Sequence, residues 1–295
     1  MAVGTAVAGG GRGGAARGAG WRRFGAAAWL GWQIEGNWTD PLLFALYAMA
    51  KPLATGFILL ALYLVASGGT TADPRFAWMW VGNAFFPVVT LLLMGLSWAI
   101  VDDREIYQML KYVYVSPVGL FVFLAGRAVT KAALAFAACA ILVAVGGFLG
   151  VHYEWSVSGV LYGTAALLLG FLGTFGLGLS LAGFGLVLPR HSIGLNDGVS
   201  ALFYVITGAV FPLDLLPAFV RAPALTLPLP WWFEAMRRGL GVPTPSGFLG
   251  EWGSGAILAA LALTAVAWAW GGATLYRLCE RQAKQRGLLD VSTNF

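Results

Sequence analysis

Charged and reactive side chains are scarce in this chain of 295 residues. Only 11% of its residues are charged, against roughly 25% in soluble domains, and 59% are hydrophobic, with a mean hydropathy of +0.78. The two cysteines lie far apart, Cys139 within an apolar run and Cys279 just after one. They predict neither a disulfide framework nor a metal site. The composition predicts an integral membrane protein.

Groups that could carry catalysis are also few. The sequence around Ser180 faintly resembles the nucleophile site of an intramembrane protease, but the only histidines are His152 and His191. Along a helix, His191 would lie about 16 Å from Ser180, too far to form a dyad. None of the 13 acidic residues falls in the middle of an apolar run, where an ion-coupled carrier needs them. The chain also lacks the G-x-x-x-x-G-K-[ST] loop that cradles ATP phosphates.

The 18 basic residues are distributed unevenly between the ends of the apolar runs. They form no patch that would predict a nucleic-acid partner, although the net charge is +5. Most of them flank one set of ends, and the opposite set has only Arg75, Arg221, Arg237 and Arg238. By the positive-inside rule, both termini are predicted to be cytoplasmic in a multi-pass protein of the cell membrane. We expect Lys131, at the start of a run, to reach the inner interface.

Apolar windows of about 20 residues predict an all-α membrane protein with six transmembrane helices. The expected spans cover 51–67, 76–101, 128–150, 159–188, a run from 199 into the segment that follows it, and 254–276. Residues 1–23 are rich in Gly and Arg and predict a disordered cytoplasmic tail, while 277–295 predict a second tail. Residues 24–47, which are rich in tryptophan, predict a helix lying along the membrane interface.

The segment 207–240 is too apolar for a soluble loop and too interrupted for a spanning helix. The run that feeds it, 199–211, would be only about 20 Å long as a helix, against a hydrocarbon core of about 30 Å. Its prolines each remove a backbone donor, and irregular backbone at membrane depth persists only where protein or water surrounds it. The segment therefore predicts a re-entrant hairpin that lines a gate. These prolines are Pro212, Pro217, Pro223, Pro228 and Pro230.

Acidic, basic and aromatic residues alternate only in the connection between the second and third predicted spans. Its carboxylates, Asp102, Asp103 and Glu105, would suit the first turn of a helix, where the dipole is positive. Ser116 and Pro117 would end that helix. Two interpretations stay open, namely a surface helix that packs on its own protein and a docking element for a cytoplasmic partner.

Both segments resemble motifs of the ABC type-2 permeases, the membrane subunits of ATP-binding-cassette exporters. In the hairpin the matching residues are Gly208, Phe211, Pro212, Leu216, Pro217, Leu227, Pro228, Glu234 and Arg237. In the connection they are Asp103, Arg104, Glu105, Ser116, Pro117, Gly126 and Arg127. The chain departs from many relatives at Ile106, Tyr107 and Gln108, where those carry Glu-Gly.

The resemblance implies a non-catalytic subunit that exports a lipophilic or amphiphilic substrate such as a drug, a lipid or a peptide. Lipid-linked polysaccharide is the alternative substrate. ATP and Mg²⁺ would sit on separate nucleotide-binding subunits, with no cofactor on this chain, and the permease would form a homodimer or a heterodimer in the lipid bilayer. The implied docking residues are Asp102, Asp103, Arg104, Glu105, Tyr107, Leu110, Ser116 and Pro117. The implied outer gate comprises Gly208, Phe211, Pro212, Pro217, Pro228, Glu234 and Arg237.

Overall fold

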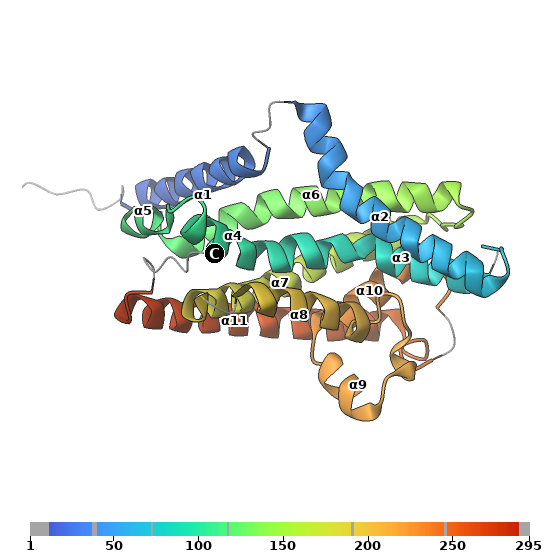
Figure 1. Cartoon of the computed structure of the whole chain (residues 1–295). Helices are drawn as coiled ribbons and strands as arrows, with labels where there is room; N and C mark the ends of the chain where they lie inside the picture. The colour runs from blue at the N-terminus through green and yellow to red at the C-terminus, as the bar shows by residue number, and fades with distance from the viewer. Residues whose placement is uncertain are drawn as a thin grey trace, which may run out of the picture.

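The computed structural model describes residues 12–36, 40–71, 73–116, 118–189, 192–244 and 247–288. Over these residues the chain is mainly helical and contains no strand. Five helical stretches lie alongside one another and are long and apolar enough to cross a membrane (Figure 1). They are Leu46–Ser67, Pro74–Glu105, Leu120–Phe148, Val157–Val187 and Ser254–Gln285. The expected all-α membrane architecture is confirmed at this level.

The remaining predicted span falls on α8 (Ser192–Ile206), which has 15 residues. A helix of that length is roughly 22 Å long and does not cross a 30 Å core by itself. The count of six crossings therefore stays a prediction. At the first span, α2 (Pro41–Ser67) begins before residue 51, because Pro52 is accommodated inside the helix.

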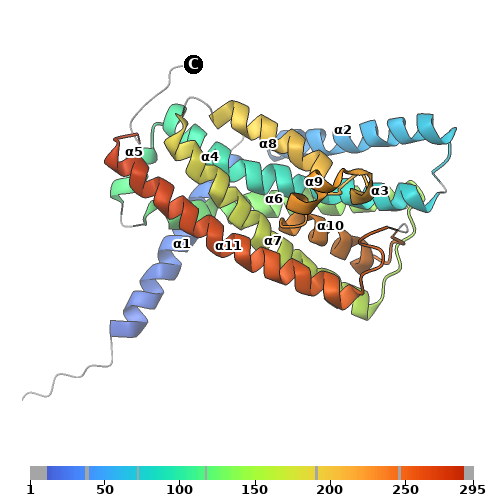
Figure 2. The same ribbon diagram turned by 90° about the horizontal axis from the view of Figure 1, so that it is seen from below.

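Helix α1 (Arg12–Gly36) occupies part of the segment predicted to be disordered. Residues 1–11 lie outside the described residues, but 12–23 are helical, so the prediction of disorder is wrong for that stretch. The alanines around α1 favour helix, and Ala27 is buried where α1 packs on Gly126 of α6 (Leu120–Phe148). Figure 2 shows α1 extending away from the bundle, oblique to the long helices.

One continuous stretch occupies the centre of the bundle, built from α3 (Pro74–Val88), a π-helical turn (Val89–Met94) and α4 (Gly95–Glu105). Asp73 caps its start by accepting a hydrogen bond from the Arg75 backbone N–H at 2.8 Å. Pro87 has no backbone N–H to donate to the preceding turn, and the wide turn follows it directly. Most of this stretch is buried.

The last long helix, α11 (Ser254–Gln285), packs closely against α7 (Val157–Val187). Gly272 of α11 lies so near Gly176 of α7 that a β-carbon would overlap the Gly176 carbonyl oxygen. Small residues at such crossings let two membrane helices approach backbone to backbone.

We expect Gly272→Ala to destabilise the purified protein by about 1–3 kcal/mol, because the new methyl group must push α7 and α11 apart. The neighbouring Gly271 has no heavy atom within 4 Å of its β-position, so Gly271→Ala gains the same helix propensity without a clash. A lower melting temperature for Gly272→Ala only would confirm the close crossing. Equal melting temperatures for both variants would contradict it.

The two ends of the bundle differ in construction. At one end lie α5 (Leu110–Val115), α1 and the C-terminal end of α11 (Figures 1 and 2). At the other end, the chain between α8 and α11 folds into a 3-10 turn (Leu213–Leu215), α9 (Ala218–Ala224) and α10 (Pro228–Gly239). The two segments that the sequence singles out therefore lie at opposite ends.

Candidate functional site

The hairpin segment begins where α8 ends, at Thr207 and Gly208. Gly208 has a φ of 71°, a left-handed conformation that glycine adopts without strain, and it reverses the chain. Pro217 immediately precedes α9, and Pro228 is the first residue of α10, where a missing N–H is tolerated. Nearly all of α10 is buried. The start of the segment, 207–210, and α10 are therefore enclosed by protein, whereas much of the chain between them is exposed.

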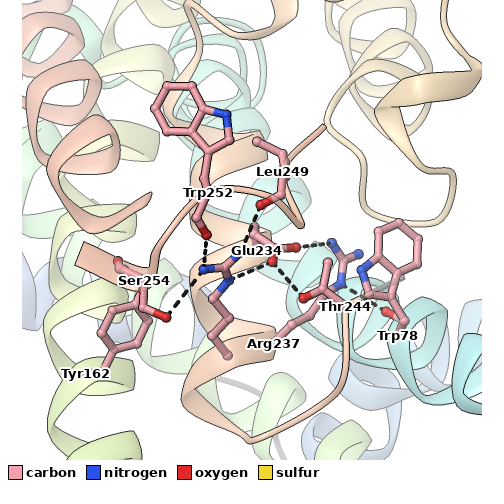
Figure 3. Close-up of polar contacts among 9 residues, drawn as sticks. Trp78, Tyr162, Glu234, Arg237, Thr244, Leu249, Trp252 and Ser254 are labelled. Carbon is pink, nitrogen blue, oxygen red and sulfur yellow. Dashed lines mark hydrogen bonds and ion pairs between the residues drawn. The ribbon is translucent and has the colours of Figure 1, made fainter. Parts of the chain in front are cut away.

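Arg237 of α10 holds the start of this segment, and Figure 3 shows its side chain beside Trp78 of α3. Its guanidinium is buried and donates through Nη2 to the carbonyl oxygens of Gly208 and Ala209, both at 2.8 Å. Its Nε donates to the Trp78 carbonyl of α3 at 3.0 Å, and the guanidinium lies 3.6 Å from the centre of the Trp78 ring. One side chain thus joins α10, the end of α8 and α3. We call this arrangement the Arg237 clamp.

Glu234 holds the other side of α10 (Figure 3). Its buried carboxylate accepts through Oε1 from Arg238 Nε at 2.8 Å and from Thr244 Oγ1 at 2.7 Å. Arg238 also donates to the carbonyl oxygens of Leu249, at 2.8 Å, and Trp252, at 2.6 Å. Glu234 and Arg238 therefore tie α10 to the loop that leads into α11.

The structure brings together only part of the predicted gate. Glu234, Arg237, Gly208 and Pro212 line one small cavity of about 30 Å³. Pro228 packs instead on Gly173 of α7. The remaining two predicted gate residues lie outside this cluster on exposed parts of the hairpin, namely Phe211 and Pro217.

Sequence reasoning missed several contributors to the clamp. Trp78 supplies a carbonyl and a ring, and Thr244 supplies a hydroxyl. Gly82 of α3 leaves no room for a β-carbon beside the Ala209 carbonyl and the Arg237 guanidinium. A glycine inside a spanning run was the available signal for this close approach.

The connection between the second and third predicted spans differs from its prediction in helix position. Asp102 to Glu105 occupy the last turn of α4 and not the first turn of a new helix, so the predicted dipole contact is wrong. The helix that begins at Pro74 continues because Ile100 and Val101 are buried and extend its packed face. At this end of a helix the favourable charge is Arg104.

Three of the predicted docking residues are internal. Asp103 is fully buried and accepts from Arg127 Nη1 of α6 at 2.7 Å. Arg104 is also buried and donates to the Gly185 carbonyl of α7 at 3.1 Å and to Glu105 at 2.9 Å. Leu110 is buried as well. These residues hold the connection in place and are not available to a partner.

Four other apolar or aromatic side chains of the connection are at least half exposed, and we name them the docking surface. They are Ile106 (70% exposed), Tyr107 (50%), Tyr112 (65%) and Val115 (77%). Only Tyr107 among them was predicted. The Ser116 hydroxyl donates to the Val113 carbonyl at 2.7 Å at the end of α5, and Pro117 lies outside the described residues.

A cavity of about 790 Å³ lies between α2, α3, α6 and α8. Apolar side chains from three of these helices line it, including Phe44, Phe86, Leu91 and Leu134. Charged residues on its wall are Glu35, Lys51 and Asp197, and neutral polar ones include Asn83 and Tyr204. Such a lining suits a molecule with a large apolar part and a polar group. Within the described residues, no cluster of His, Cys, Asp or Glu could hold a metal ion.

Together these features define a multi-pass α-helical membrane protein with an internal cavity, a docking surface at one end and the Arg237 clamp toward the other. The chain belongs to the ABC-2 type transporter family, whose model matches residues 26–240. It is thus an ABC transporter permease subunit, and the family implies an ABC ATP-binding partner in general. The resemblance seen in the sequence is confirmed. A comparison with curated proteins found no match.

Proposed function

We propose that this permease exports a lipophilic or amphiphilic molecule, such as a drug, a lipid or a peptide, driven by ATP hydrolysis in a separate subunit. The observation that carries this proposal is the docking surface. Four exposed apolar or aromatic side chains gather on a connection that buried ion pairs hold rigid. Aromatic anchors on a fixed backbone are typical of protein interfaces. ATP and Mg²⁺ would be held by the partner.

The 790 Å³ cavity supports the proposed class of substrate. Its wall is largely apolar, and Glu35, Lys51 and Asp197 provide its formal charges. The Arg237 clamp lies toward the opposite end from the docking surface, at the start of the hairpin segment. In the proposed cycle, closure of the ATPase subunits moves the docking surface, and access to the cavity switches from the inner side to the outer side past the hairpin.

The orientation and assembly of the permease belong to the same proposal. The excess of basic residues at one set of span ends supports an orientation with both termini and the docking surface in the cytoplasm of a cell-membrane protein. In that orientation, α1 lies along the inner interface, and α8 with the following hairpin completes the sixth crossing. Two permeases, identical or related, would pair within the lipid.

Export of lipid-linked polysaccharide is a second candidate. Four aromatic side chains line the cavity, and aromatic rings could receive either an acyl chain or a sugar. They are Phe44, Tyr47, Phe86 and Tyr204.

The proposal predicts how ATP hydrolysis is divided between subunits. The purified permease is expected to hydrolyse no ATP, because its sequence contains no phosphate-binding loop. Co-purification with an ABC ATPase from the same cells should restore hydrolysis that responds to candidate amphiphiles in proteoliposomes. Phosphate release measured on both preparations is the test. Robust hydrolysis by the permease alone would contradict the assignment.

A further inference from the structure

A cluster of charges at the inner end of the bundle joins α1 to α6. Glu35, in the last turn of α1, receives Lys131 Nζ at 2.5 Å and Arg127 Nη2 at 3.4 Å through the same carboxylate oxygen. Both cations come from α6. Glu35 also lies on the wall of the 790 Å³ cavity. A movement of α1 would therefore move a charged part of that wall.

Arg127 extends this cluster to the docking surface. Its side chain is buried, and while Nη2 faces Glu35, Nη1 donates to Asp103 at 2.7 Å. Asp103 lies three residues before Ile106, the first residue of the docking surface. One guanidinium thus stands between a carboxylate on the cavity wall and a carboxylate at the docking surface.

The same three residues have a second way to pair. Arg127 Nε and Asp103 Oδ2 are buried and have no hydrogen-bond partner in the present arrangement. If Arg127 released Glu35, its guanidinium could engage Asp103 through two parallel hydrogen bonds, the geometry that arginine and carboxylate prefer. Glu35 would keep Lys131 as its partner. In the shared arrangement Arg127 contacts both Glu35 and Asp103, and in the two-bond arrangement it makes a second hydrogen bond to Asp103 instead of the contact with Glu35. Each arrangement makes a contact that the other lacks, as a two-state element requires.

We propose that Glu35 and Arg127 are positioning residues that couple α1 and the cavity wall to the docking surface. This inference rests on the proposed function, because that function supplies the ATPase as the partner at the docking surface. When Arg127 is shared, α1 is held against α6 and Asp103 is held by a single bond. When a partner binds the docking surface and Asp103 enters the two-bond arrangement as a result, α1 loses its contact with Arg127. Coupling of this kind acts in both directions, so changes at α1 must reach the docking surface.

Amide hydrogen exchange of the full chain in lipid nanodiscs, measured by mass spectrometry, tests this coupling. Glu35→Gln removes the charge that holds Arg127 in the shared arrangement. We expect exchange to change at least threefold in peptides covering 24–36 and also in peptides covering 106–116. If only α1 responds, Glu35 merely attaches α1 to the bundle, and the proposal is overturned. No change in either segment overturns it as well.

Two further variants separate coupling from general loosening. Lys131→Met removes the partner that Glu35 keeps when it releases Arg127, so it should favour the shared arrangement and shift exchange of 106–116 in the opposite direction to Glu35→Gln. Asp103→Asn approaches from the opposite end, and it should alter exchange in α1 even if Glu35→Gln folds poorly. A response of 106–116 to Lys131→Met in the same direction as that to Glu35→Gln would contradict the coupling. The same holds if Asp103→Asn leaves α1 unchanged.

This measurement needs no ATPase. A negative result would therefore remove the coupling and leave the docking surface to be tested by its own variants. Conversely, if the permease proved not to bind an ATPase, the hydrogen-exchange result for the coupling would remain valid. Asp214→Asn, which breaks a pair with Arg221 at 3.7 Å in the hairpin at the other end of the bundle, serves as a control for removing a carboxylate. It should alter neither segment.

Discussion

Arg237→Met is expected to yield little folded permease, with a loss of stability of about 3–5 kcal/mol. The variant leaves the carbonyl oxygens of Trp78, Gly208 and Ala209 without their donor. Each buried polar group that loses its partner costs about 1–3 kcal/mol, and water is scarce in a membrane to replace the donor. Such a loss is a large part of the 5–15 kcal/mol that typically stabilises a folded protein. The melting temperature and the monodisperse yield in detergent measure it.

Two other substitutions make this experiment specific. Arg221 belongs to the same hairpin and pairs with Asp214 at 3.7 Å, with both side chains partly exposed. Arg221→Met should therefore cost under about 1 kcal/mol. Arg237→Lys keeps the charge but loses the planar fork, so its effect should lie between the two. Equal stability of Arg237→Met and Arg221→Met would show that the clamp does not hold the hairpin.

Loss of ATPase binding is the expected result of the double variant Tyr107→Ala, Tyr112→Ala. These two rings are the largest side chains of the docking surface, and buried aromatic anchors typically contribute more than about 1 kcal/mol each to an interface. Together they should weaken binding by about 3 kcal/mol, or roughly a hundredfold in Kd. Co-purification of the ATPase and ATP-dependent transport should both fall, while the melting temperature of the permease stays the same.

The control for this pair is Trp155, which is 64% exposed and lies in the loop before α7, at the other end of the bundle. Trp155→Ala removes a comparable aromatic surface and should leave ATPase binding intact. If the double variant binds the ATPase as tightly as the unmodified permease, the docking surface is misassigned.

Hydropathy was sufficient to predict five of the long helices, because the cost of exposing polar groups to lipid acts on each segment by itself. It did not predict α8 as observed, since the run is short, or the helical state of residues 12–23, which contain no long apolar run. The misplaced helix start at Asp102 has a similar cause. No breaker separates that turn from the span before it.

The functional residues were predicted as positions in a motif, but their partners were not. Arg237 binds backbone carbonyls, which every residue possesses, so no sequence pattern marks them. Asp103 and Arg127 both matched the family motif, and opposite charges at two matched positions were a signal that they could pair. Which carboxylate faces inward depends on helix rotation. That rotation is fixed by the whole bundle.

The π-helical turn between Val89 and Met94 sets the phase of the central span. An added residue within one turn advances every later side chain around the axis by about 100°. Before the turn, Gly82 faces the hairpin, and after it, Asp103 faces Arg127. The side chains before and after the turn thus owe their directions to different stretches of backbone. This single wide turn keeps the two parts of the stretch in register with partners at opposite ends of the bundle.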